Sequence, residues 1–165
     1  MAVTYTNYAK TVSDAFRGIL RDEFTATFGS PNIDIVLSDH FESEIISNKG
    51  EYIRYWIEED LLESAAANGE TRNYMVGCYY YVDVYKKHVQ RDWETLLSDR
   101  VEHIKTIINT NISYAPSGTY KWHNASVESI SDPLTIAESD NMDIMGFENV
   151  KCVKLSIKIT RGNFS

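Results

Sequence analysis

A histidine lies among three carboxylates in residues 39–44. Asp39, His40, Glu42 and Glu44 fall within this short segment. Imidazole and carboxylate groups bind metal ions, and they also act as general acids and bases. One hypothesis is therefore a small carboxylate-dependent hydrolase that uses Asp39, His40 and Glu42. The alternative is a polar loop that leaves a strand, and we favour this alternative.

No other motif in the sequence indicates a reaction. His88, His103 and His123 lack metal-ligand spacing, and each is predicted to be a surface histidine. No lysine follows an acidic residue by two positions, which is the spacing of a restriction-endonuclease type of nuclease. The sequence also has no glycine-rich phosphate loop and no Gly-x-Ser-x-Gly turn. We therefore predict that the protein is not an enzyme and has no catalytic residue, cofactor or bound metal.

The chain is acidic and has the length of one domain. Its 165 residues carry a net charge of −8, with a pI near 5.0. Proteins that wrap nucleic acid or dock on anionic membranes need a basic surface, so this charge argues against both classes. No segment approaches the ~20 apolar residues of a membrane span or resembles a signal peptide. The expected location is a cytoplasm, where Cys78 and Cys152 would be buried, reduced thiols.

The spacing of apolar residues predicts two amphipathic helices and about five strands. The first helix is expected over residues 6–27, and the second carries a stripe through Trp93, Leu97, Val101, Ile104 and Ile108. The expected strands are 33–37, 51–58, 78–85, 120–130 and 150–160. Acidic loops are expected at about 59–73, as a long exposed hairpin loop, and at 131–148. Residues 1–165 thus form one α/β domain of the α+β type, whose mixed, mainly antiparallel sheet carries two principal helices.

Aromatic residues gather on one face of two predicted strands. Tyr79 and Tyr81 alternate with the apolar residues of their strand, and Tyr52 and Trp56 do the same on theirs. A second helix layer could cover these rings. The other interpretation is a subunit interface, because Tyr and Trp provide a large, rigid contact area with a polar tip.

The segment 131–147 is predicted to contact a partner protein. It is acidic, but it also contains four large apolar residues, which are costly to expose together. These residues are Met142, Ile144, Met145 and Phe147. Protease cleavage there is expected to be fast in the free subunit and slow in an assembled particle.

The order of elements resembles the tail terminator proteins of long-tailed bacteriophages, also called tail completion proteins. The resemblance spans the chain from the first helix to the last strand and is carried by residues 50–57, 79–85, 93–97 and 153–159. It implies a homo-hexameric ring in the virion that caps the tail tube and presents a docking surface to the head. The implied partners are the tail tube protein, a head-closure or neck protein, and a sheath protein if the tail is contractile. The family has no enzymatic activity and no cofactor.

A ring around passing DNA suits an acidic chain. Asp60, Glu63 and Glu70 could line its channel, because a negative wall repels phosphate and lets DNA slide without specific binding. The segment 131–147 is longer than a simple turn between strands, which leaves open another neck component, such as a head-closure or connector-adaptor protein. A monomeric adaptor that binds a single host protein is a further alternative.

Overall fold

The computed structural model describes residues 2–29, 33–37, 49–89, 91–135 and 149–164. The elements follow one another as α1 (Tyr8–Phe28), β1 (Asp34–Leu37), β2 (Glu51–Ala66), β3 (Gly69–Asp83), α2 (Trp93–Thr110), β4 (Asn124–Ile130), β5 (Leu134–Thr135) and β6 (Val150–Phe164). The predicted helices are both present, and β6 extends past the predicted end at residue 160.

The described strands form one mixed sheet in the order β1-β2-β3-β6-β4. β1 runs parallel to β2, whereas the other pairs are antiparallel, and the short β5 pairs with the start of β6. The predicted fold class is confirmed: a single α+β domain with two helices on a mainly antiparallel sheet. The C-terminal strand β6 lies between β3 and β4, so strands that are distant in sequence are neighbours in space.

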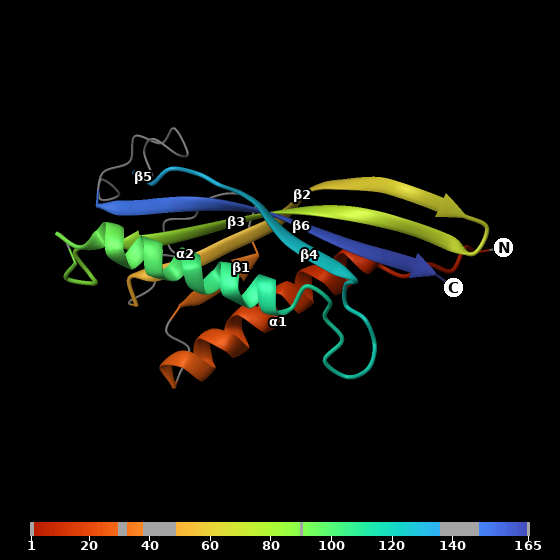
Figure 1. Cartoon of the computed structure of the whole chain (residues 1–165), viewed down its shortest axis with the longest axis horizontal. Helices are drawn as coiled ribbons and strands as arrows, with labels where there is room; N and C mark the ends of the chain where they lie inside the picture. The colour runs from red at the N-terminus through yellow and green to blue at the C-terminus, as the bar shows by residue number, and fades with distance from the viewer. Residues whose placement is uncertain (1, 30–32, 38–48, 90, 136–148, 165) are drawn as a thin grey trace.

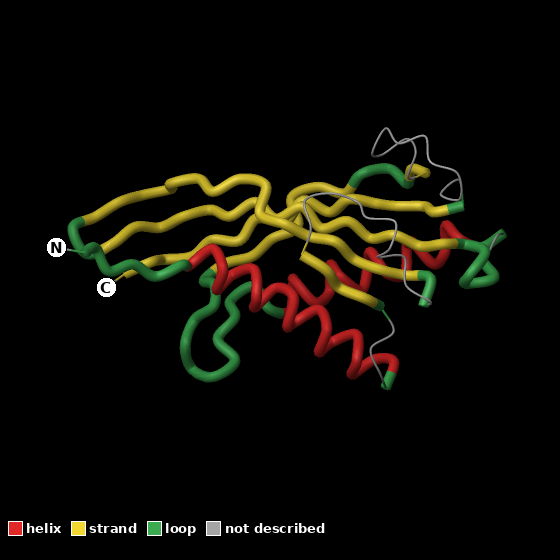
Figure 2. Tube along the Cα trace, turned by 180° about the vertical axis from the view of Figure 1, so that it is seen from behind, coloured by secondary structure: helices red, strands yellow, loops and turns green. Residues whose placement is uncertain are grey.

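Both helices pack on the same face of the sheet (Figures 1 and 2). Each helix contributes one apolar stripe to the main core, as its three-to-four residue spacing predicts. Phe16, Leu20 and Phe24 of α1 are buried there, and so are Leu97 and Ile104 of α2. The sheet contributes alternate residues, so each strand has a helix-facing side and an opposite side.

The prediction of a hairpin loop at 59–73 is wrong. These residues continue β2 and β3 as a paired ladder that closes at a two-residue turn, with Gly69 at φ 149°. We call residues 59–66, 69–75 and 158–164 the arm, because Figure 1 shows β2, β3 and β6 continuing past α2 to the end where both termini lie. Most arm residues of β2 are exposed, so the apolar alternation that marks a strand is missing.

The two cysteines lie on opposite faces of the sheet. Cys78 belongs to the main core beneath the helices, whereas Cys152 packs on the other face with Tyr52 and Tyr81. The sheet therefore separates them, and Cys78 is a free thiol whose burial raises its pKa to about 12. Among the described residues, no helix has the length and hydropathy to cross a membrane.

Candidate functional site

The sheet face opposite the helices carries an aromatic cluster, formed by Tyr52, Trp56, Tyr79 and Tyr81 around Arg54. Tyr52 stacks on Tyr81 with ring centroids 4.6 Å apart, and Trp56 stacks on Tyr79 at 4.9 Å. The two stacks meet because Tyr79 and Tyr81 lie two positions apart on β3. The Arg54 guanidinium lies 4.8 Å from the Tyr79 ring centroid and 5.1 Å from that of Trp56. Contacts of this kind fix the rings relative to one another.

An ion pair lies beside the aromatic cluster and crosses the central strand. Lys154 of β6 lies with its Nζ 2.8 Å from a carboxylate oxygen of Glu58 on β2. The two strands are separated by β3, on which Lys154 is paired with Tyr79 and the Glu58 carboxylate lies against Gly77. A Cβ at Gly77 would lie 2.7 Å from the Glu58 Cδ, so a larger residue there would displace the carboxylate. The glycine therefore makes the contact across two strand spacings possible.

The burial of the aromatic side chains tests the prediction that they form a subunit interface. Tyr52 and Tyr81 are buried within the subunit, with 2% and 0% of their surface exposed. They pack against each other and against Val150 and Cys152, so the prediction is wrong for these two residues. Trp56 and Tyr79 are half-buried, and their role in an interface stays a prediction.

The three acidic residues predicted to line a channel all lie on the arm. Asp60 and Glu70 do not stand alone, because Arg72 pairs with both, at 3.0 Å and 2.5 Å. Glu63 is exposed near the end of β2. The arm carries four carboxylates and three cations, which include Lys158 and Arg161 of β6, so its surplus of negative charge is a single charge. Whether it faces DNA stays a prediction.

The arm also exposes large apolar side chains. Leu61 and Leu62 are 49% and 54% exposed, and Phe164 of β6 is 52% exposed. Single exposed apolar residues are common, but contiguous groups of them mark interaction surfaces. Leu61 and Leu62 are consecutive on β2, so each face of the arm exposes one leucine. This arrangement suits contact with another protein.

A buried carboxylate joins the sheet to α2 on the helix-facing side. Glu51 is fully buried and pairs with Arg100 Nε and Lys87 Nζ, each at 2.7 Å, and it accepts a hydrogen bond from the Tyr80 hydroxyl. Burial alone would raise the pKa of Glu51, but the hydrogen bonds from Arg100, Lys87 and Tyr80 outweigh it and lower the pKa. All the groups named are satisfied by one another, so the cluster holds the fold together and offers no reactive atom.

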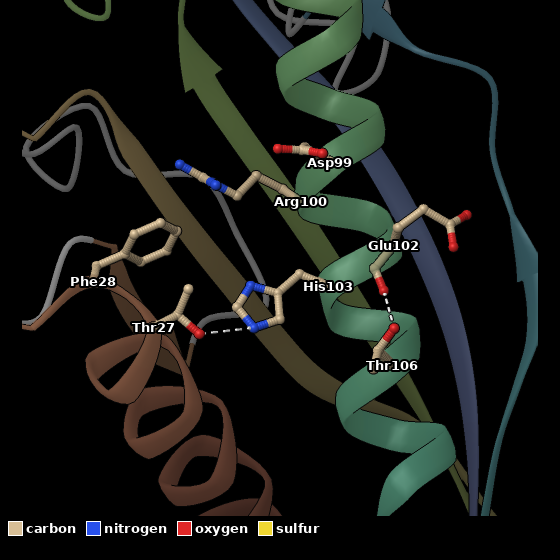
Figure 3. A pocket seen from close by; sticks show the side chains of 7 residues that line it. All are labelled: Thr27, Phe28, Asp99, Arg100, Glu102, His103 and Thr106. Carbon is tan, nitrogen blue, oxygen red and sulfur yellow. Dashed lines mark hydrogen bonds between the residues drawn. The ribbon is translucent and has the colours of Figure 1, made fainter.

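An open pocket of about 370 Å³ lies between the end of α1 and α2 (Figure 3). His103 reaches from α2 to Thr27, with Nε2 3.3 Å from the hydroxyl oxygen, which resembles a base beside a nucleophile. The Thr27 hydroxyl, however, donates to the Glu23 carbonyl, so it can only accept from His103. His103 also packs edge-on against Phe24. It is half-buried and makes a helix–helix contact where it lines the open pocket.

Several predicted residues lie outside the part of the chain that the structure describes. These are Asp39, His40 and Glu42 of the hydrolase hypothesis, and Met142, Ile144, Met145 and Phe147 of the predicted partner contact. Of the second predicted acidic loop, 131–148, the described part contains β5. Among the described residues, no group of three or more His, Cys, Asp or Glu side chains could hold a metal ion.

No protein-family model matches this chain, and no curated protein matches it either. The resemblance of its element order to tail terminators therefore stays a prediction.

Proposed function

We propose that this protein is a structural subunit of a bacteriophage virion, a tail terminator that forms a ring between the tail tube and the head–neck complex. The observation that carries the proposal is the arm. A three-stranded extension with adjacent exposed leucines projects from a core stabilised by two helices. A folded core with one protruding contact surface suits a subunit that binds its neighbours in a closed assembly.

The charge of the chain supports a ring through which DNA passes. DNA must pass through such a ring without being held by it. A net charge of −8 makes phosphate contacts unfavourable for the chain as a whole. A subunit that bound DNA for recognition would need a basic surface instead.

The test is the symmetry and position of the assembly. We expect negative-stain images of the particle to show a six-fold ring with a central hole between head and tail tube. Some rings close only on their partner, so the purified protein is imaged both alone and with tail tubes that lack their cap. Light scattering should then give six times the 18.9 kDa of one chain for the closed ring. A compact dimer, or a protein that stays at 18.9 kDa with tail tubes present, would contradict the proposal and favour a monomeric adaptor.

The closest alternative within the same class is another neck component, such as a head-closure or connector-adaptor protein. The length of the segment 131–147 favours it. The two are distinguished by what the ring binds. A tail terminator should bind uncapped tail tubes in the absence of heads, whereas a head-closure protein should bind DNA-filled heads in the absence of tails.

The hydrolase hypothesis has a separate test. A site that holds a metal at one hundred times its dissociation constant stabilises the folded protein by about 2.7 kcal/mol. We expect the melting temperature to stay unchanged when divalent ions are added and when a chelator removes them. A strong dependence would support a site built on Asp39, His40 and Glu42, and it would overturn the structural role.

A further inference from the structure

Residues 2–6 have the composition of a strand but belong to no strand of the described structure. The segment reads Ala-Val-Thr-Tyr-Thr, in which β-branched and aromatic residues predominate. Val3 is 88% exposed and Tyr5 is 84% exposed. These two alternate with Thr4 and Thr6, so a strand here would carry its large apolar residues on one face.

The outer edge of β2 is a strand edge with room for a partner. β1 pairs only with the stretch from Tyr52 to Tyr55. Beyond Tyr55, within the described residues, β2 pairs with β3 alone. The backbone N–H and C=O groups that point away from β3 are thus available to another strand, and such edges take up extended segments from other chains.

The available edge and the segment 2–6 match in length. Irregularities interrupt β2 between Ile57 and Glu59 and again between Leu62 and Ser64. Between them, residues 59–62 form a regular stretch, and a strand of four or five residues fits beside it. Bulges at both ends limit how far a longer strand could pair.

The charges and side chains along the edge of β2 also suit pairing with residues 2–6. The edge is acidic, with Glu59 and Asp60 within the regular stretch and Glu63 just after it. Residues 2–9 carry no charge, so a strand from this segment meets no like-charge repulsion there. Leu61 and Leu62 point to opposite faces of β2, so one of these exposed side chains offers an apolar partner to the face that carries Val3 and Tyr5, since cross-strand neighbours contact one another.

Residues 2–6 also lie at the end of the molecule that carries the arm. Tyr5 and Asp60 both line one pocket on the arm, and Figure 1 places the N-terminus beside the hairpin turn. In its own subunit, however, the segment reaches the arm and pairs with no strand of the described structure. Its large side chains stay exposed there, so the contact within one subunit is incomplete.

We propose that residues 2–6 of one subunit add as a strand to the outer edge of β2, along residues 59–62, of the next subunit. The inference rests on the proposed ring, because it names the contact that joins neighbouring subunits. The donated segment and the accepting edge are different surfaces, so the contact is head-to-tail, which is the type that closes a ring.

The first experiment deletes residues 2–6 and keeps Asn7, whose side chain caps α1 through the Lys10 backbone N–H. Because Val3 and Tyr5 are exposed, the deletion should leave the melting temperature of the subunit unchanged. It should abolish the ring seen with the wild-type chain, and an excess of a peptide with the sequence of residues 2–7 should inhibit wild-type assembly. If the deletion variant forms the ring as well as wild type, the inference is wrong and the proposed function is untouched.

The second experiment identifies the pairing. A Thr4→Cys variant and a Leu61→Cys variant, of different tag lengths, are mixed and treated with a short bis-maleimide. We expect a crosslink between the two chains, and none when Thr95→Cys on α2 replaces Leu61→Cys. Wild type provides the background, since Cys78 and Cys152 are buried. A crosslink found only within the double variant Thr4→Cys/Leu61→Cys would show pairing inside one subunit and overturn the inference, as would no crosslink. Failure of wild type to assemble at all would instead contradict the proposed function.

Discussion

Gly77 has no side chain, and the Glu58 carboxylate occupies the space where its Cβ would lie. Replacing Gly77 by alanine places a Cβ against the Glu58 carboxylate, and overpacking of this kind costs about 1–3 kcal/mol. We expect Gly77→Ala to lower the free energy of unfolding by that amount in urea titrations. Gly18→Ala is the matched control, because nothing lies within 4 Å of its new Cβ, and Ala in a helix interior gains about 0.5–1 kcal/mol over Gly.

A second variant identifies the cause of the Gly77→Ala effect. If the clash with Glu58 is responsible, Glu58→Ala should recover most of the stability in the double variant, because neighbouring substitutions are not additive. Equal losses with and without the Glu58 side chain would mean that the strain lies elsewhere in β3.

Substitution of Glu51 is also expected to lower the free energy of unfolding strongly. Glu51→Gln keeps the size of the side chain but leaves the Arg100 and Lys87 charges without their buried counter-ion, and breaking a buried pair costs about 3–5 kcal/mol. We expect this loss at neutral pH in chemical denaturation. A loss below 1 kcal/mol, the range of a surface pair, would contradict the described cluster.

The ionisation of Glu51 also makes the stability of the folded protein depend on pH. The folded-state pKa of Glu51 is lowered, so its contribution is fully present above the unfolded-state pKa of about 4.3. The contribution is lost as the pH falls through the lower, folded-state pKa. Urea titrations from pH 7 downward should therefore show wild type losing more stability than Glu51→Gln.

At the scale of elements, the packing of α2 is the part of the fold that its sequence determines most directly. Ile104 is fully buried, so Ile104→Asp places a charge in the main core and should cost several kcal/mol, as should Leu97→Asp. Ser98→Asp on the exposed side of the same helix is the control and should change stability by less than about 0.5 kcal/mol. Thermal melts of the three variants measure the difference. If Ile104→Asp melted like Ser98→Asp, the described packing would be wrong.

The arm shows where sequence reasoning fails. Helix stripes were predictable because each helix has one buried side, which imposes a period on the sequence. The arm has no such period, since the consecutive residues Asp60, Leu61 and Leu62 stand on both of its faces and all are exposed. The Asn68-Gly69 pair, a common hairpin signal, was the available clue, although the structure has the two-residue turn one position earlier, at Ala67 and Asn68.

Side-chain contacts between the paired strands β2 and β3 could not be predicted from the sequence either. The stacks of Tyr52 on Tyr81 and of Trp56 on Tyr79 depend on the register of β2 against β3. The pattern showed that these rings share a face, but it could not show that they cover one another. For the same reason the pairing of Arg72 on β3 with Asp60 on β2 could not be anticipated.

At the scale of the whole molecule, the charge of the arm makes a prediction about DNA passage. Replacing Asp60, Glu63 and Glu70 by lysine would surround Arg72 with cations and turn the arm basic. We expect the ring to form and DNA ejection to slow, more steeply at low salt, because a basic wall binds phosphate through counterion release. The neutral variant with Asn and Gln at these positions is the control. Unchanged ejection with all three lysines would mean that the arm does not face the channel.

The strand order has a consequence for how the chain is made. β6 lies between β3 and β4, although it is synthesised after both. Until Val150 and the residues that follow have left the ribosome, the inner edges of β3 and β4 stay uncovered, and pairs such as Asp83 with Val150 must close a long loop. The nascent chain therefore exposes two unpaired strand edges until β6 is made, and pairing with another chain at these edges competes with folding until then.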